Sequence, residues 1–505
     1  MIRADEQSMP EPAPQPIGYA PASLAPPKDE SPPHFIRSMG LLSATAVNMT
    51  QICGVGPFIT IPLMVAAMGG PQAILGWIAG AILAMADGLV WAELGAAMPH
   101  AGGTYLYLRE AFQYRTGKLM PFLFVWSAMI YIPLTMSTGV IGMVQYLGYY
   151  WPVLGTTPAP GSKDWLKIHL LSMAIVIVTC WALYRSISVI ARVSSFLWVI
   201  MMVSVGGVIV ASFTHFHPSL AFAFPPGAFH PSKAFFSGLG AGLIIAIYDY
   251  MGYNTTAYMA DELRDPGRVL PWSIIYSVIG MMIIYLAMNI GVMGVMPWSD
   301  VAHSTSIGSA VFEFTWGKTA ARVFTALIIV TAFASVFTGL LGGSRVPYNA
   351  ARDGLFLSPF GRLHPRLNFP HVALVVMCVI TAIGTFFKLD DVIAMLVALM
   401  VLVQCIGQIL ALTVLRQRQP GLRRPYRMIL YPLPSLIALV GWIYAYVASG
   451  WSTIYWSSWM LAAGVIAFLI WAAVQKTWPF GPLQIREEFL EAQAANAGLA
   501  DQSIS

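Results

Sequence analysis

Three carboxylates lie inside long apolar stretches of the sequence: Asp87, Glu93 and Asp249. A charged side chain at membrane depth is costly, so such residues usually contact a substrate, carry a proton or pair with another polar group. Asp249 is the most informative of the three because tyrosines 248 and 250 flank it. Its chemistry would be that of a buried carboxylate, which can attract a cation or take up a proton.

The sequence leaves several uses open for each acid. Asp249 could bind the distal ammonium or guanidinium of a cationic substrate, carry a coupled proton, or cap a helix by accepting from freed N–H groups. Asp87 is the deeper of the two acids in its segment; it could pair with a polar group across the bundle, and it is a candidate for proton coupling or gating. Glu93 lies closer to the segment's end, and we expect a structural or gating residue that pairs with a loop arginine or backbone N–H groups.

A helix break accompanies these acids. Gly54-Val55-Gly56-Pro57 interrupts the apolar segment 38–67, and Gly252 interrupts segment 233–260. Lipid cannot satisfy free backbone groups, so unwound backbone is tolerated where it lines a protein cavity. Freed N–H groups at a helix start favour a carboxylate, and freed carbonyls can accept from an ammonium. The alternative is a proline kink or a close helix–helix contact.

Other polar residues recur at helical spacing. Ser335 and Thr338 share one face and form a possible ion site, although such hydroxyls often bond their own backbone. Gln404 shares a face with Gln408 and could line a pathway or join helices. Trp126 and Tyr131 are candidate cavity walls, with ordinary packing as the alternative for each. The four cysteines lie in apolar segments without metal-ligand spacing, so we expect neither a metal nor a cofactor.

The composition defines the elements that must position these residues. Of the 505 residues, 57% are hydrophobic and 10% are charged, and the mean hydropathy is +0.70. This composition is typical of a polytopic all-α membrane protein in a lipid bilayer. We predict twelve transmembrane helices: 38–67, 71–97, 119–150, 165–184, 190–213, 233–260, 271–296, 321–344, 370–388, 391–415, 429–449 and 452–475.

The distribution of Lys and Arg predicts the orientation. With the N-terminus in the cytoplasm, the inner loops carry 16 of these residues and the outer loops carry 6. This positive-inside pattern predicts a cytoplasmic (inner) membrane protein with both termini in the cytoplasm. The net charge of +5 is therefore no sign of nucleic-acid binding.

The breaks also predict the organisation of the chain. Interruptions in the first and sixth spans indicate two inverted repeats of five helices, residues 38–213 and 233–415, followed by two extra helices in 429–475. The proline-rich residues 1–37 are predicted to form a disordered cytoplasmic tail. Residues 476–505 are predicted to form a cytoplasmic C-terminal tail.

Four motifs in order resemble those of the amino acid–polyamine–organocation (APC) permease superfamily. They are "GVGPF" (54–58), "WAELGAAMPHAGGTYLYLREAF" (91–112), "YDYMGYNTTAYMADELRDPGRVLP" (248–271) and "GGSRVPYNAARDGLFLSPFGRLHP" (342–365). The resemblance covers essentially all twelve spans and implies the five-plus-five fold, a central substrate site and alternating access. The Gly-x-Gly-Pro-Phe form is most similar to the polyamine-uptake and L-type amino acid transporter branch.

The resemblance implies which residues hold the substrate. Backbone amides near 53–57 would hold a carboxylate, carbonyls near 248–251 would accept from the ammonium, and Tyr248 or Tyr250 would cover the site. Pro57 departs from the family pattern and removes one N–H, and segment 194–207 lacks the lysine that replaces sodium in some members. The candidate substrate residues are Cys53, Gly54, Val55, Gly56, Pro57, Trp126, Tyr131, Tyr248, Asp249, Tyr250, Met251, Gly252, Tyr253 and Gln404.

These observations predict a secondary active transporter for amino acids or polyamines. We expect proton coupling or exchange rather than sodium coupling, and a cationic substrate because of Asp249. A neutral amino acid is the alternative substrate, and a substrate sensor without flux is the alternative class. The sequence shows no catalytic constellation, so an enzyme is not expected.

Overall fold

The computed structural model describes residues 39–99, 103–156, 158–184, 187–365, 369–475 and 480. Both predicted tails lie outside the described residues, Phe480 excepted. Within the described part of the chain all regular elements are helices, and the β-type pairing is limited to one isolated bridge. The elements are α1 (Leu41–Ile52), α2 (Gly56–Met68), α3 (Ala73–Ala97), α4 (Thr104–Thr116), α5 (Leu119–Leu147), η1 (Pro152–Gly155), α6 (Lys163–Leu183), α7 (Ile187–Thr214), α8 (Pro218–Ala221), α9 (Lys233–Tyr250), α10 (Thr255–Tyr258), η2 (Ala260–Glu262), α11 (Pro266–Val295), α12 (Trp298–His303), α13 (Ile307–Gly343), α14 (Arg345–Arg352), η3 (Ser358–Gly361), α15 (His371–Gly384), α16 (Leu389–Met400), η4 (Val401–Cys405), α17 (Ile406–Arg418), α18 (Leu433–Ala448) and α19 (Trp451–Val474).

The helices confirm the all-α membrane class. Within the described residues, seven helices are long and apolar enough to cross a membrane, and the bent pair of α1 and α2 gives an eighth. Shorter apolar helices occupy Val199–Thr214, His371–Gly384 and Leu433–Ala448. Each of the twelve predicted segments coincides with helix in the structure. Twelve crossings and the inverted repeat stay predictions.

The first break lies where the sequence predicts it. Helix α1 ends at Ile52, α2 begins at Gly56, and the two axes differ by 52°. Proline is tolerated in the first turn of a helix because the N–H that it lacks would have no intrahelical partner there. Pro57 therefore starts α2 rather than kinking one continuous helix.

The second break packs directly against the first. Helix α9 ends at Tyr250, and Gly252 adopts a φ of +116°, which favours glycine. A Cβ atom at Gly252 would lie 2.9 Å from the backbone of Gln51 and Ile52. Glycine is required at this position both by its conformation and by the close approach of the first span.

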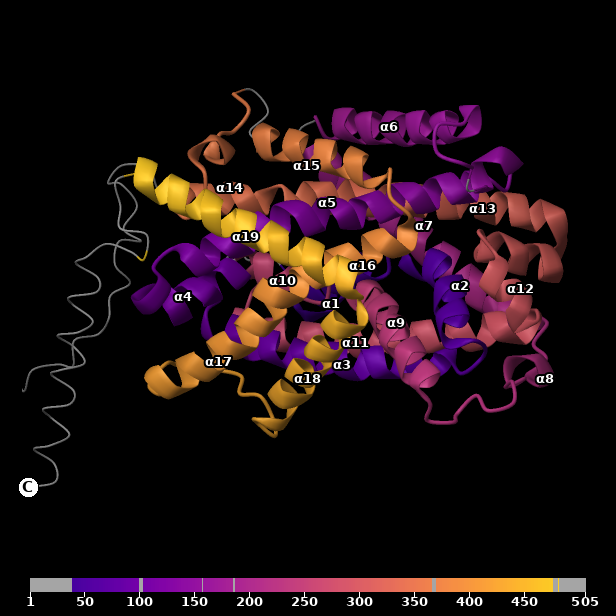
Figure 1. Ribbon diagram of the computed structural model, residues 1–505, viewed down its shortest axis with the longest axis horizontal. Helices are drawn as coiled ribbons and strands as arrows, with labels where there is room; N and C mark the ends of the chain where they lie inside the picture. Colours follow the sequence, from indigo (N-terminus) through magenta and orange to yellow (C-terminus); the bar gives the residue numbers. More distant parts are fainter. Residues whose placement is uncertain are drawn as a thin grey trace, which may run out of the picture.

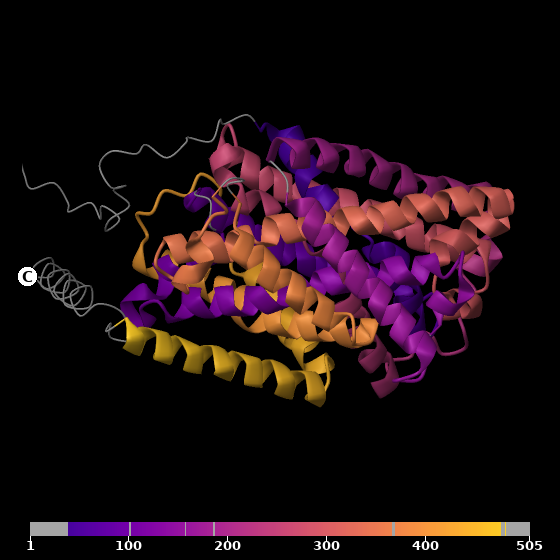
Figure 2. The same cartoon turned by 90° about the horizontal axis from the view of Figure 1, so that it is seen from above.

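The broken helices lie at the centre of the molecule. In Figure 1, α1, α2, α9 and α10 lie between a layer containing α5 and α13 and a layer containing α3 and α11. Contacts agree with this view, because α3 packs on α9 and α11 while α5 packs on α13 and α16. Helices α6 and α19 lie at the periphery, and Figure 2 shows α19 along one edge. Only 22% of the apolar window of each of these two helices is buried, as expected of lipid-facing spans.

Polar contacts hold the two breaks together at one end. Met39 and Leu263 form the isolated bridge, in which the Met39 N–H donates to the Glu262 carbonyl at 3.1 Å. Deeper in the bundle, the buried Asn48 amide donates to the Thr256 hydroxyl at 3.1 Å and accepts from the Thr256 N–H at 2.9 Å. These bonds fix the start of the first span to the segment that follows the second break.

Candidate functional site

A cavity of about 240 Å³ lies between the two breaks. Its walls come from both unwound segments and from α5, α13, α14 and the π-helical turn η4. The cavity reaches the surface beside α14, where Gly342 and Arg345 are exposed. Such π-helical turns are frequent at functional sites.

Helix ends define the polarity of the cavity. No backbone hydrogen bond from the N–H of Gly54 or Val55 is present within the described residues, and both residues line the cavity. Helix α2 starts beside them, so its positive end adds to these donors. Helix α9 ends at Tyr250 and directs its negative carbonyl end toward the same space. The arrangement presents donors and acceptors to a small molecule that carries both charges.

The hydroxyl of Tyr285 links the two broken spans. It donates to the carbonyl oxygens of Ile52 and Asp249, each at 2.9 Å, in a shared hydrogen bond. Tyr285 is 1% exposed and comes from α11. One side chain therefore satisfies a freed carbonyl from each break and fixes their relative position.

Asp249 lies beside the start of α2. One of its carboxylate oxygens accepts from the Thr60 hydroxyl, while the other, Oδ1, has no hydrogen-bond partner in the described part of the chain. A Cβ atom at Gly56 would lie 2.1 Å from Oδ1, so the carboxylate fills the place of a side chain there. Asp249 is 1% exposed. Its carboxylate accepts no backbone N–H among the described residues, which speaks against the helix-cap interpretation.

Tyrosines close the cavity toward α12. The Tyr248 hydroxyl lies 2.6 Å from the Thr138 hydroxyl. Tyr146 donates to the Phe58 carbonyl at 2.8 Å and accepts from the Gly308 N–H at 3.0 Å. These bonds join α2, α5, α9 and α13 on the side of the cavity away from α14.

The wall opposite the breaks carries one polar pair. Tyr131 on α5 donates to the Gln404 side chain in η4 at 2.6 Å, and both residues line the cavity. Gln408 lies outside the cavity lining and accepts from Thr104 at 3.4 Å. Gln404 thus faces the cavity, whereas Gln408 joins helices.

The possible ion site shows mixed geometry. A Cβ atom at Gly54 would lie 2.6 Å from the Ser335 hydroxyl oxygen, so Ser335 faces the first break. Thr338 instead donates to the Ala334 carbonyl of its own helix at 2.8 Å. Both residues line the cavity, but Thr338 takes the backbone-bonded alternative.

Asp87 ties the second break to the periphery. The Tyr253 hydroxyl donates to one of its oxygens at 2.6 Å, and the Trp442 indole N–H donates to the other at 3.1 Å. Asp87 is 1% exposed. Its carboxylate therefore connects α3, the unwound segment and α18.

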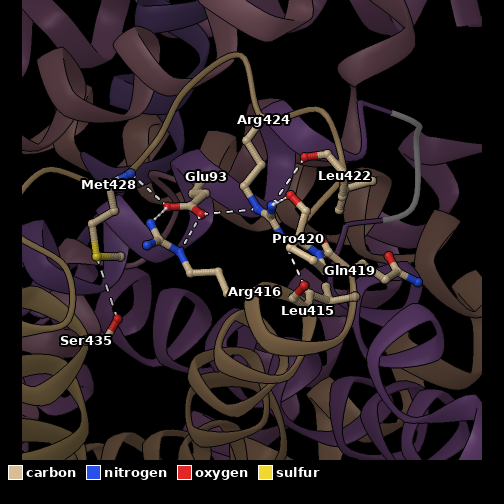
Figure 3. A network of polar contacts seen from close by, with 9 residues as sticks. All are labelled: Glu93, Leu415, Arg416, Gln419, Pro420, Leu422, Arg424, Met428 and Ser435. Atoms are coloured by element: carbon tan, nitrogen blue, oxygen red, sulfur yellow. Dashed lines mark hydrogen bonds and ion pairs between the residues drawn. The ribbon is translucent and has the colours of Figure 1, made fainter. Parts of the chain in front are cut away.

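Glu93 forms the ion network drawn in Figure 3. Arg416 donates to both of its carboxylate oxygens, and Nε of Arg424 lies 3.5 Å from Oε1. The Met428 N–H donates to Oε2 at 2.7 Å. The Arg416 guanidinium also stacks on the Tyr431 ring, 3.8 Å from its centroid. The pairing with a loop arginine and a backbone N–H that the sequence suggested is present.

Most predicted substrate residues come together at the cavity, and four do not. The cavity is lined by Gly54, Val55, Gly56, Tyr131, Tyr248, Asp249, Met251, Gly252, Tyr253 and Gln404. Cys53 and Pro57 are buried outside the lining. Trp126 is wrong as a wall, because its indole donates to the Met460 carbonyl on α19 at 3.0 Å. Tyr250 turns away from the cavity and packs against Tyr285 and Trp77, so Tyr248 is the aromatic residue at the site.

Sequence reasoning missed Asn48, Thr60, Thr138 and Tyr285. Each contacts a break residue from another helix or from a distant part of the chain. Their polarity within apolar segments could have pointed to these residues. Hydroxyl-bearing residues are so frequent in those segments, however, that polarity alone does not single out the ones at the site.

Comparison with known proteins identifies the class. Residues 39–471 match the amino acid permease family. The chain belongs to this family. The permease is 29% identical over 433 residues to the mouse Asc-type amino acid transporter 1, covering 82% of the permease and 76% of that protein. It is 25% identical to two Bacillus subtilis proteins, the branched-chain amino acid permease BcaP (86% and 92% covered) and the glutamate/serine transporter AimA (86% and 80% covered). These relatives are transporters, so the permease is a multi-pass membrane transport protein and not an enzyme.

Proposed function

We propose that the permease is a secondary active transporter that moves a free amino acid by alternating access. The observation that carries this proposal is the cavity between two unwound segments, which joins the N-terminal end of α2 to the C-terminal end of α9. In this proposal the N–H groups of Gly54 and Val55 hold the carboxylate of the amino acid. The carbonyl end of α9 holds its ammonium group.

A neutral amino acid fits the cavity best. Asp249 is almost fully buried, and its Oδ2 is already bonded to Thr60. Away from Asp249 and from Arg345 at the surface, the cavity is lined by uncharged side chains such as Tyr131, Met136 and Gln404. The names of these two relatives include branched-chain amino acids and serine, and glutamate as the one charged substrate. A polyamine is disfavoured because it lacks the carboxylate that the N–H groups of the first break would bind.

A cationic amino acid is the second candidate. The free Oδ1 of Asp249 is the specific observation in its favour, because an unpaired buried carboxylate oxygen would gain from an ammonium or guanidinium. Such a substrate would have to approach Oδ1 beside Gly56, where a Cβ atom would lie 2.1 Å from that oxygen.

Coupling is proposed to use a proton or exchange rather than sodium. The Thr338 hydroxyl donates to the Ala334 carbonyl of its own helix, which weakens the case for a sodium site formed with Ser335. Asp249, with a hydroxyl partner on one oxygen and none on the other, is the proposed proton carrier. Asp87 is less suited to this role because two donors already hold its carboxylate.

The proposed architecture is the five-plus-five repeat of residues 38–213 and 233–415, followed by helices in 429–475. The proposed location is the cytoplasmic membrane, with both termini and the arginine-rich loops inside. In this orientation the cavity opens to the cytoplasm beside α14, and the tyrosine layer of Tyr146 and Tyr248 closes it to the outside.

A thermal-shift screen of the detergent-purified protein tests the substrate class. Leucine, alanine, serine, glutamate, arginine and putrescine would each be added at millimolar concentration. A ligand at 100 times its Kd stabilises by about 2.7 kcal/mol. A higher melting temperature with leucine, alanine or serine supports a neutral amino acid as substrate. A higher melting temperature with arginine alone supports a cationic amino acid instead. Binding without flux in liposomes would instead indicate a sensor.

A further inference from the structure

A second cavity, of about 650 Å³, lies at the surface of the molecule. Its walls are the end of α3, the start of α11 and the loop between α17 and α18. It shares no lining residue with the central cavity. The transport mechanism proposed above leaves it without a role.

The charges of this cavity favour an anion. Arg268 and Arg423 line it and are exposed, and neither forms an ion pair with any residue that the structure describes. Asp265 is the one carboxylate of the lining. The neighbouring Arg424 points instead to Glu93, as Figure 3 shows. Helix α11 is 30 residues long and starts in this cavity at Pro266, so its positive end adds to the two guanidinium groups.

Tyr426 forms part of the wall of the same cavity. Its ring lines the cavity, while its hydroxyl oxygen is buried away from solvent. The donors that the cavity offers to an anion are therefore the two guanidinium groups. Phosphate oxygens accept charge-assisted hydrogen bonds from such groups.

An apolar path continues from the cavity along α11. Trp272 lines the cavity and stacks on Tyr276 with ring centroids 5.5 Å apart. Trp272, Tyr276, Ile279 and Ile283 are 38%, 47%, 39% and 60% exposed and follow one another at helical spacing. Exposed aromatic residues next to exposed aliphatic ones are typical of helix ends at the membrane interface. An exposed apolar strip therefore begins at the cavity that carries the two arginines.

We propose that Arg268 and Arg423 bind the phosphate of an anionic phospholipid whose acyl chains lie along Trp272, Tyr276, Ile279 and Ile283. A free phosphate shares the headgroup chemistry, but it would leave the apolar path unused. The cavity lies among the arginine-rich loops, and on the orientation proposed above it faces the cytoplasmic leaflet, where anionic lipids attract basic residues. Lipid binding is separable from transport because it uses none of the central cavity.

Native mass spectrometry and thermal shift of the full chain in detergent test this site. The probes are phosphatidylglycerol, phosphatidylcholine and inorganic phosphate at equal concentrations. The test variant is Arg268→Gln/Arg423→Gln, and the control variant Arg115→Gln/Arg362→Gln removes the same charge from exposed positions outside the cavity. Each arginine at an anionic surface contributes about fivefold in affinity. We expect the test variant to bind phosphatidylglycerol about 25-fold more weakly and the control to bind it as the wild type does.

Three results would overturn the proposal. Equal binding of phosphatidylcholine would remove the charge argument, and unchanged binding by the test variant would place the lipid elsewhere. Saturable binding of inorganic phosphate that displaces phosphatidylglycerol would make the ligand a soluble anion. Because the substituted arginines are exposed, we expect the lipid-free melting temperature of the test variant to match that of the wild type. The charge-preserving Arg268→Lys/Arg423→Lys variant should retain most of the binding.

Discussion

The hydroxyl of Tyr285 holds together the two places where the permease interrupts its own helices. It donates to one freed carbonyl from each break, at Ile52 and Asp249. Asp249 in turn reaches α2 through Thr60. At the scale of single residues, the site thus depends on a few side chains that fix unwound backbone, and the cavity follows from their positions.

Replacing Tyr285 by phenylalanine removes both hydrogen bonds and keeps the ring packed between Trp77 and Tyr250. We expect substrate affinity to fall about tenfold, because two buried carbonyls lose their donor and the breaks shift. Isothermal titration with the substrate found by the thermal-shift screen measures this. Tyr276→Phe, on the exposed face of the same helix, is the control and should bind normally. Normal affinity in Tyr285→Phe would show that the bonds do not position the site.

Asp249→Asn keeps the shape of the side chain but cannot carry a proton. We expect exchange of unlabelled for labelled substrate to persist within about threefold, and accumulation driven by a pH gradient to be lost. Proteoliposomes with and without the gradient separate the two activities. Asp391→Asn, an exposed acid at the start of α16, should behave as the wild type. Gradient-driven accumulation by Asp249→Asn would exclude Asp249 as the proton carrier.

At the scale of helices, the Glu93 network connects α3 to the loop between α17 and α18. Glu93 is fully buried, and its partners are two arginines and the Met428 N–H. Breaking a buried pair leaves uncompensated charge, so the loop position and the packing of α17 on α3 both depend on this carboxylate.

Glu93→Gln tests this connection. We expect the free energy of unfolding to fall by about 3 kcal/mol, because Arg416 and Arg424 lose their counter-charge. The melting temperature in detergent measures the effect. Glu110→Gln serves as control, since its ion pair with Arg109 is partly exposed and contributes little. Equal melting temperatures for the two variants would contradict the structural role of Glu93.

The sequence predicted the breaks better than the walls. Gly54, Pro57 and Gly252 act through local backbone chemistry, which a single sequence reveals, and the helix boundaries at Ile52 and Tyr250 agree with them. Trp126 was misplaced because an aromatic residue on a long helix can face either a cavity or a neighbouring helix. Here its indole N–H donates to the Met460 carbonyl on α19. The Tyr285 contacts join residues 233 and 36 positions apart, so spacing along the chain could not show them.

At the scale of the whole molecule, the cavity is open at one end and closed at the other. It reaches the surface beside α14. On the opposite side, Tyr248 is hydrogen-bonded to Thr138 and Tyr146 to the Phe58 carbonyl. Figure 1 shows α4, α14 and α17 at one end of the bundle and α8 and α12 at the other. This asymmetry is what the proposed alternating access requires of one of its two states.

Thiol labelling tests this asymmetry. In a Cys405→Ser background, Thr338→Cys should react with a membrane-impermeant reagent from the side of α14 and be protected by substrate, because Thr338 lines the cavity. Thr60→Cys is the buried control outside the lining and should stay unreacted. Faster labelling of Thr338→Cys from the α12 side would show that the cavity opens toward α12 and not toward α14.

In the proposed mechanism an amino acid crosses the membrane through the space between the two breaks. Counterflow of labelled leucine, alanine and serine into proteoliposomes tests it most directly when the wild type is compared with Gly54→Leu. A Cβ atom added at Gly54 would lie 2.6 Å from the Ser335 hydroxyl oxygen, so a leucine side chain would fill the site. We predict flux of at least one amino acid by the wild type and its loss in a Gly54→Leu protein of unchanged monodispersity. Equal flux by both proteins would show that the amino acid does not pass between the two breaks.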